Sequence, residues 1–183
     1  MARWASPEII ARAVDGSQSA VEELIAAIWP GCFRLAMMVT GDRGLAEDAA
    51  QETCVIVDHK VRGLRRIEAF DAWLYRIVMR ESARVRRRRG QAAEPAEESI
   101  LIDDTVSLDV WRALAALSPE LREVTVLFYF DDLSGEEIAA ALRISHGSVR
   151  VRLTRARERL RSMLSDYDSR PQETSWEVQH NAV

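Results

Sequence analysis

The feature that most restricts the fold of this chain is a pair of helical patterns within residues 133–164. In residues 149–164, apolar side chains recur at steps of three and four, which predicts a helix with one buried stripe. Ahead of it, Ser134 and Glu137 form a capping-box pattern that predicts the start of a shorter helix. The stripe of the longer helix consists of Val149, Leu153, Ala156, Leu160 and Leu164. A short helix, a turn and a longer helix together predict a helix-turn-helix.

The longer helix is rich in arginine, since residues 143–161 hold seven basic and one acidic side chain. In a helix-turn-helix the second helix enters the major groove of DNA, so the pattern predicts DNA binding. The alternative is a bundle helix whose arginines only keep its surface soluble. We favour it less, because like charges on adjacent turns cost a few tenths of a kcal/mol each unless an anion compensates them.

Charge alternates along the rest of the chain, although the net charge is −4. Residues 60–89 hold 11 basic and 3 acidic side chains, and residues 91–109 hold six acidic and no basic ones. A polyanion responds to the local field, so two basic blocks remain compatible with nucleic-acid binding. The acidic stretch has little periodicity, which favours a flexible linker that either repels itself into an extended form or occupies a cationic groove.

No β-rich run occurs, and the hydrophobic content of 48% supports folded cores. We therefore predict an all-α protein of two small helical domains, at residues 1–89 and 108–165, joined by the acidic linker at 90–107 and followed by a disordered tail at 166–183. The first domain is expected to contain a helix that stops at Pro30 and Gly31.

Several classes of function are disfavoured by the sequence. Cys32 and Cys54 lie in unrelated helical segments without a CxxC pattern or a nearby histidine pair, so we expect reduced thiols, no metal and no cofactor. Paired carboxylates occur without a neighbouring histidine, glycine loop or nucleophile, which argues against catalysis and a small-molecule substrate. No run approaches 18 apolar residues and no signal peptide is evident, so we expect a cytoplasmic protein without membrane insertion.

Residues 45–58 predict an amphipathic helix with a strongly acidic outer face. Glu47, Asp48, Gln51 and Glu52 lie on that face, opposite a stripe of small apolar residues. The face is a candidate protein-binding surface, and the alternative is an ordinary solvated helix face.

A basic segment from Lys60, interrupted by Gly63, predicts a loop before a helix over about residues 70–88. On this helix an arginine recurs every fourth residue, and Trp73 lies near that line. Such arginines neutralise phosphates, and an aromatic ring stacks on an unpaired base. The alternative places Trp73 in the core. The arginine line consists of Arg76, Arg80, Arg84 and Arg88.

Three motifs in order, DRGLAEDAAQET at 42–53, FDAWLYRI at 70–77 and RARERL at 155–160, resemble the extracytoplasmic-function (ECF) sigma factors of the sigma-70 family. The resemblance covers residues 6–165. It implies regions 2 and 4 of a sigma factor, which has no catalytic activity, binds core RNA polymerase and directs it to promoter DNA. It also implies an anti-sigma factor as a partner.

The resemblance assigns roles to individual residues. The acidic helix would grip the clamp helices of the largest polymerase subunit through Asp48, Gln51 and Glu52. The minus-ten element would be captured and melted by Lys60, Arg62, Arg65, Arg66, Trp73, Arg76, Arg80 and Arg84. The minus-thirty-five element would be read by Ser148, Arg150, Val151, Thr154 and Arg155. The linker would thread the polymerase active-site and RNA-exit channel.

The chain departs from the family pattern at Arg143, where the turn commonly holds glycine; a left-handed conformation there costs on the order of 1 kcal/mol. Val78, Met79 and Arg80 replace a frequent Ala-Arg-Asn, so an unusual minus-ten preference is expected. Two rival hypotheses remain at this point: a dimeric helix-turn-helix regulator that binds duplex DNA without polymerase, and a protein-interaction module whose arginines bind an acidic partner.

Overall fold

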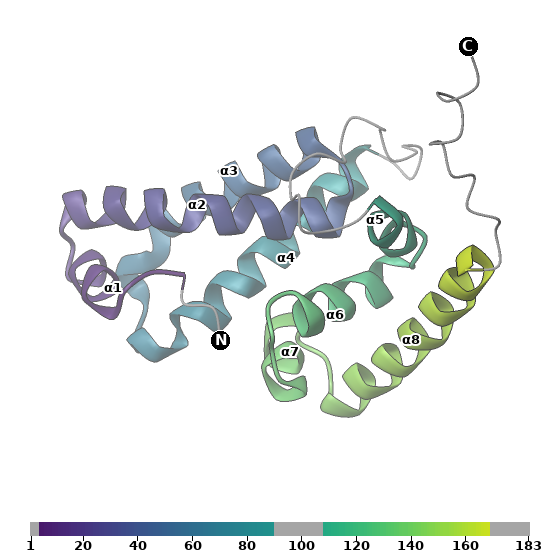
Figure 1. Ribbon diagram of the computed structural model, residues 1–183. Helices are drawn as coiled ribbons and strands as arrows, with labels where there is room; N and C mark the ends of the chain where they lie inside the picture. The colour runs from purple at the N-terminus through teal and green to yellow at the C-terminus, as the bar shows by residue number, and fades with distance from the viewer. Residues whose placement is uncertain (1–3, 90–107, 169–183) are drawn as a thin grey trace, which may run out of the picture.

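The computed structural model describes residues 4–89 and 108–168, and within these ranges the chain is helical with no strand. The predicted all-α class is confirmed, whereas the linker at 90–107 and most of the tail lie outside the described residues. Figure 1 shows the first four helices as one layer and the last four as a second group beside it. The helices are α1 (Pro7–Val14), α2 (Gln18–Thr40), α3 (Arg43–Lys60), α4 (Phe70–Arg89), α5 (Leu108–Ala115), α6 (Pro119–Tyr129), α7 (Gly135–Leu142) and α8 (His146–Asp168).

Helix α2 runs without interruption through Pro30, so the predicted stop at Pro30 and Gly31 is wrong. A proline in a helix interior costs about 3 kcal/mol. The apolar stripe continues on both sides of it, and Leu24, Ile28 and Cys32 are fully buried. Burial of several such side chains at about 1.5–3 kcal/mol each outweighs the cost of the proline.

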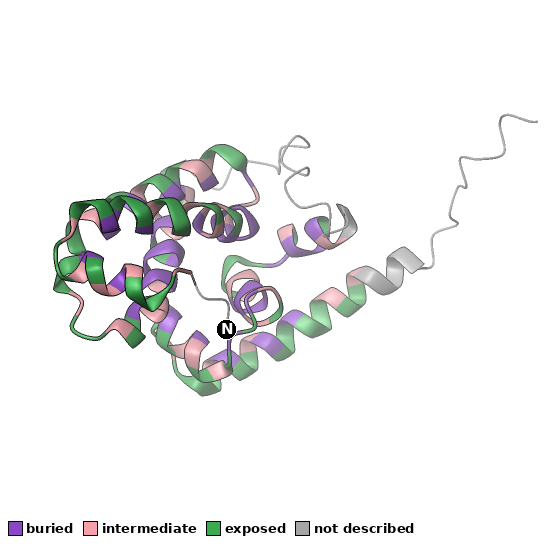
Figure 2. Cartoon of the chain, turned by 60° about the vertical axis from the view of Figure 1, so that its left-hand side comes forward, coloured by how far each residue is buried: buried purple, intermediate pink, exposed green. Residues whose placement is uncertain are grey.

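By length and composition, α2 is also apolar enough to cross a membrane, and no other helix in the described ranges is. The sequence analysis did not anticipate this. The apolar residues face neighbouring helices, because α2 packs against α1, α3, α4 and α6. Figure 2 shows that buried positions and exposed positions alternate along the same helices. The apolar composition of α2 is thus explained by its position as the central helix in the core of a helical bundle.

Side-chain caps fix where the helices of the first half begin. The Ser6 hydroxyl accepts from the Ile9 amide at 3.4 Å, and the Asp42 carboxylate accepts from the Leu45 amide at 2.9 Å. These bonds satisfy amides that would otherwise lack partners in the first turn. The Asp42 cap starts α3 two residues before the predicted position 45 and thereby sets which α3 side chains point away from α2.

Both cysteines are free and buried, as the sequence predicted for structural thiols. Burial raises the pKa of Cys32, and the nearby Cys54 thiol adds to this effect. Burial likewise raises the pKa of Cys54 to about 11. A thiol is reactive as its thiolate, so these groups are poor nucleophiles at neutral pH.

The helix-turn-helix is formed by α7 and α8 as predicted. Ser134 and Glu137 make the full capping box, with the Glu137 carboxylate accepting from the Ser134 amide at 2.9 Å. Arg143 ends α7 in the left-handed region, at φ 56° and ψ 44°. A residue other than glycine is strained in this conformation. The turn keeps its left-handed geometry rather than being remodelled around the arginine.

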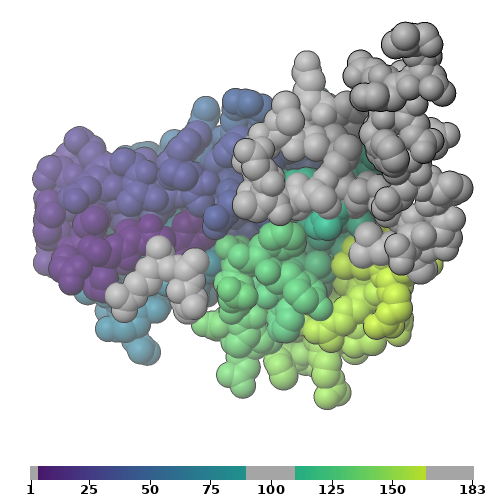
Figure 3. All heavy atoms as spheres, in the orientation of Figure 1, coloured from purple at the N-terminus to yellow at the C-terminus, as the bar shows by residue number. Residues whose placement is uncertain are grey.

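The two halves of the chain pack against each other: α6 contacts α2, and α7 contacts α4. Arg86 of α4 donates to the Glu123 carboxylate of α6 at 3.1 Å, and both Arg86 and Arg122 donate to the Val39 carbonyl, at 3.3 and 3.1 Å. Figure 3 shows the halves abutting along this boundary. The sequence predicted two domains but gave no sign that their cores are continuous.

Arg122 is the most enclosed cation of this boundary. Its guanidinium also donates to the carbonyls of Leu114 and Leu117, at 2.8 and 3.3 Å, and to that of Ala115. The Leu114 and Ala115 oxygens lie in the last turn of α5, where carbonyls lack helical partners, and Leu117 follows two residues after the helix. Burial, with a contribution from Arg86, lowers the pKa of Arg122 to about 10, so it remains charged at neutral pH. One side chain therefore caps α5 and joins the two halves.

Candidate nucleic-acid interface

Helix α8 presents a continuous polar face on the side opposite its core stripe. Val149, Leu153 and Ala156 are buried. The predicted reading residues Arg150, Val151, Thr154 and Arg155 are all exposed, and Val151 is 48% exposed. The structure thus brings four of the five predicted residues onto one face.

The fifth predicted residue, Ser148, lies at the start of this face and is half-buried. Its hydroxyl is 2.8 Å from that of Ser145, and the Ser145 hydroxyl accepts from the Ser148 amide at 3.1 Å. These bonds organise the first turn of α8. Within the described part of the chain, neither Arg150 nor Arg155 forms an ion pair, so both guanidinium groups remain available to an anionic ligand.

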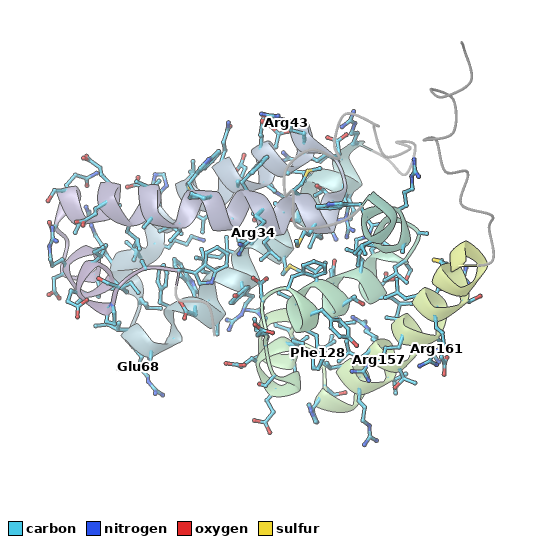
Figure 4. All side chains as sticks on the ribbon, in the orientation of Figure 1. Arg34, Arg43, Glu68, Phe128, Arg157 and Arg161 are labelled. Atoms are coloured by element: carbon cyan, nitrogen blue, oxygen red, sulfur yellow. The ribbon has the colours of Figure 1, made fainter. Side chains whose placement is uncertain are left out.

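Arg157 behaves differently from its neighbours on α8. Its Nε donates to the Tyr129 hydroxyl at 2.8 Å, and its guanidinium lies 5.5 Å from the Phe128 ring centre and 5.9 Å from that of Tyr129. Figure 4 shows Arg157 directed toward Phe128 of α6. A guanidinium over aromatic faces stabilises packing. Arg157 therefore links α8 to α6, a role that its sequence context did not reveal.

The predicted arginine line of α4 is organised around a buried acid. Glu81 is only 3% exposed, and its two carboxylate oxygens accept from Arg80 at 2.9 Å and from Arg84. Arg84 also pairs with Glu52 of α3 at 3.0 Å. Hydrogen bonding and attraction to Glu81 raise the pKa of Arg84, with a smaller contribution from Glu52. Arg80 and Arg84 are therefore paired within the protein, whereas Arg88, at the end of the line, is exposed.

Two other predicted members of this surface are half-buried. Trp73 packs its ring against Phe70, with ring centres 5.8 Å apart and planes inclined by 49°. Arg76 is half-buried, and its Nε has no hydrogen-bond partner. Trp73 thus keeps part of its ring accessible while it covers the core, a position between the two alternatives drawn from the sequence.

The segment predicted as a basic loop contains two single turns of 3₁₀ helix, Val61–Gly63 and Ile67–Ala69. Lys60 closes α3, Arg62 donates to the Gln18 side chain at 3.0 Å, and Arg66 lies 3.8 Å from Glu68. Arg65 and the other basic residues of the segment are exposed. The segment offers an accessible cationic edge at the end of α3.

The outer face of α3 carries the three predicted polymerase contacts. Asp48 and Gln51 are exposed, and the Glu52 side chain is 47% exposed beside Arg84. They line an open groove between α3 and the end of α4, together with apolar Leu45, Val55 and Val85. Val55 is 51% exposed and adds apolar surface to this acidic face.

Sequence reasoning missed the residues that organise these surfaces. Glu81 was not predicted, although its spacing of three residues from Arg84 is a detectable signal. Val55 gave the weaker signal of an apolar residue on an acidic face. The contact of Arg122 with Val39 joins residues 83 positions apart and has no local signal at all.

Comparison with known proteins matches two family models, Sigma-70 region 2 at residues 24–92 and Sigma-70 region 4 at residues 107–160. The chain is 33% identical to the ECF RNA polymerase sigma factor SigE of Mycolicibacterium smegmatis, over 84% of this chain and 66% of SigE. It therefore spans just under two thirds of the length of this relative.

Two solved structures are similar over most of the chain. The structure of CnrH in complex with the cytosolic domain of CnrY superimposes with a TM-score of 0.67 at 28% identity, covering 89% of this chain and 98% of that one. The sigma factor RpoE in complex with the anti-sigma factor NepR from Bartonella quintana gives 0.65 at 25% identity, covering 79% and 96%.

The fold and its exposed helix-turn-helix define a DNA-binding protein of two helical regions, and the matched models make these regions 2 and 4 of a sigma-70 protein. The chain belongs to the ECF RNA polymerase sigma factors. Members of this family are transcription initiation factors that act on RNA polymerase in the cytoplasm, and they are not enzymes. Among the described residues, no cluster of histidine, cysteine or acidic side chains has the arrangement of a metal site.

Proposed function

We propose that this chain binds core RNA polymerase and directs it to promoters that it recognises at minus-ten and minus-thirty-five elements. The observation that carries the proposal is the exposed face of α8, where Arg150 and Arg155 flank Val151 without internal partners among the described residues. A guanidinium exposed in this way suits bidentate contact with guanine or contact with phosphate.

In this proposal, residues 1–89 act as region 2. Asp48, Gln51 and Glu52 contact polymerase from α3, where the exposed Val55 adds apolar area beside the carboxylates. The exposed basic segment from Lys60 and the half-buried Trp73 contact the minus-ten strand. Melting a base step costs a few kcal/mol, which contacts to the freed base must offset.

Residues 108–165 act as region 4 and read the minus-thirty-five element through α8. In the proposal, the acidic residues at 90–107 connect the two regions and enter the polymerase channel.

We further propose that an anti-sigma factor binds this chain in the cytoplasm. The similarity to RpoE, which was solved with an anti-sigma factor, supports this partner. The closed packing of α6 and α7 on α2 and α4 supports a state in which the two regions are held together.

The proposal is tested by reconstitution. The full chain is mixed with core polymerase, resolved by gel filtration and supplied with genomic DNA fragments, and the RNA 5′ ends are sequenced. We expect a stable complex and a set of start sites that share two upstream elements. Arg150→Ala with Arg155→Ala should reduce these transcripts without dissociating the complex. A chain that forms no complex, or binds palindromic duplex DNA only in the absence of polymerase, would contradict the proposal.

A further inference from the structure

The ion pair between Glu52 and Arg84 joins two surfaces to which the proposed function gives different partners. Glu52 lies on the α3 face assigned to polymerase, and Arg84 lies on the α4 line assigned to DNA. The two side chains are 3.0 Å apart, with 47% and 29% of their surfaces exposed. In the absence of a binding partner, Glu52 and Arg84 therefore pair with each other.

The α4 end of this pair is fixed by a buried acid. Glu81 is 3% exposed and accepts from Arg84 and, at 2.9 Å, from Arg80. A carboxylate so enclosed remains paired, because breaking a buried ion pair costs several kcal/mol. Arg84 consequently stays anchored through Glu81 when its bond to Glu52 is lost, and only its remaining guanidinium nitrogens change partner.

The α3 end is exchangeable. Glu52 is half-exposed, and Arg84 supplies the ion pair that the structure gives it. An ion pair at the surface contributes about 0–1 kcal/mol, so a cationic group on a binding partner can replace Arg84 at little cost. Arg43, by comparison, pairs with Glu47 at 3.0 Å on the same helix and has no connection to α4.

We propose that Glu52 and Arg84 form an exchangeable contact through which polymerase binding on α3 releases Arg84 for the DNA backbone, with Glu81 as the positioning residue. This inference rests on the proposed function. Two sites are coupled when one ligand changes the contacts available to the other, and the coupling is reciprocal. An arginine held by two carboxylates is a weak phosphate ligand, whereas one held by a single carboxylate keeps free donors on its planar fork.

The test removes the Glu52 charge in place of adding polymerase. Binding of the full chain to a fluorescein-labelled, random-sequence single-stranded DNA 12-mer is measured by anisotropy at fixed salt. We expect Glu52→Gln to tighten the Kd about two- to fivefold. The matched control, Glu47→Gln, removes the same charge from the same helix but leaves Arg84 paired, so its effect should be smaller than that of Glu52→Gln.

A double-mutant cycle locates the effect on Arg84. In an Arg84→Gln background, Glu52→Gln should no longer tighten binding, whereas in an Arg84→Lys background, which keeps the charge, part of the gain should return. Thermal melts of each variant check that the fold is intact. Equal effects of Glu52→Gln and Glu47→Gln, or a gain that persists with Arg84→Gln, would overturn the inference.

A different result would contradict the proposed function. If the wild-type chain forms no complex with core polymerase on gel filtration, the assignment of the α3 face is wrong whatever the DNA data show. If the complex forms but the cycle shows no coupling through Arg84, only the exchange is wrong.

Discussion

Two arginine-rich helices in this chain use the same side chain in opposite ways. On α4, Arg80 and Arg84 are held by the buried Glu81, and Arg86 is held by Glu123. On α8, Arg150 and Arg155 are exposed and form no ion pair within the described residues. Both helices have similar local charge, so charge density alone does not identify a nucleic-acid contact. The pairing of each guanidinium decides whether it supports the fold or faces a ligand.

The difference has an energetic reason. A carboxylate as enclosed as Glu81 must be compensated, which commits its arginines to the protein. An arginine facing solvent loses little by exchanging water for phosphate and gains from counterion release. We therefore propose that α8 makes the direct contacts with DNA and that α4 has a mixed role in which folding and binding share the same side chains.

The largest expected effect is on the affinity for promoter DNA, and it distinguishes α8 from α4. Arg150→Ala combined with Arg155→Ala removes two exposed guanidinium groups, and each such contact is worth about 1–3 kcal/mol. We expect the holoenzyme to bind a mapped promoter at least 30-fold more weakly at fixed salt, while the free energy of unfolding changes by less than about 0.5 kcal/mol. A parallel loss of folding stability would show instead that these arginines support the fold.

The second effect concerns α4, where we expect a change in stability. Glu81→Gln removes the charge that holds Arg80 and Arg84, and we expect the free energy of unfolding to fall by about 2 kcal/mol. Urea denaturation with an unchanged m-value is the measurement. Glu158→Gln on the exposed face of α8 is the control, with an expected change below about 0.5 kcal/mol. Equal small changes in both variants would remove the distinction between the helices.

The third effect concerns a buried acid that is poorly paired. Burial raises the pKa of Asp131 to about 6, and Arg34, 3.8 Å away, only partly offsets this. The folded state then binds the proton more tightly than the unfolded chain, so stability falls as pH rises from about 4 to about 6. Asp131→Asn should remove this fall and stabilise the protein by about 1–2 kcal/mol at pH 7.5, with little change at pH 4.

Thermal melts across this pH range measure the effect. The neighbouring Asp132 is exposed and has φ 51°, a conformation that asparagine tolerates. Asp132 adds a smaller repulsion to the burial that raises the Asp131 pKa, so Asp132→Asn should leave most of the pH dependence in place. If both variants flatten it equally, the titrating group is not Asp131.

The smallest effect concerns Arg143, which is exposed and forms no ion pair with the residues that the structure describes. Arg143→Gly relieves a left-handed strain of about 1 kcal/mol but increases the entropy of the unfolded chain, so we expect a change of no more than about 0.5 kcal/mol, in the stabilising direction. The same substitution at Arg150, inside α8, should destabilise by about 1 kcal/mol. Calorimetry that gives both variants the same sign would argue against the left-handed turn.

Local patterns in the sequence predicted much of this structure. The capping box at Ser134, the buried stripe of α8 and the exposed set that includes Arg150 and Arg155 all follow from spacing, because helical periodicity determines which side chains share a face. At Arg143 the departure from the family pattern predicted a slightly remodelled turn, whereas the structure keeps the left-handed conformation. These features depend on residues fewer than about ten positions apart.

Other features depend on contacts between distant segments. The passage of α2 through Pro30 is decided by burial against four other helices, which outweighs the local signal of proline. Likewise, the pairing of Arg84 with Glu52 depends on the register of α4 against α3, and a charge pattern within one helix cannot reveal it. The predicted arginine line on α4 therefore identified the residues correctly as a set without revealing their partners.

The bonds by which Arg86 and Arg122 join the two halves of the chain also limit how far the protein can reach. Elements centred 10 and 35 base pairs upstream lie about 85 Å apart on duplex DNA, at about 3.4 Å per base pair. A compact chain of 183 residues is roughly 40 Å across. Occupying both elements at once therefore requires the Arg86–Glu123 pair to open, so promoter spacing acts directly on this contact.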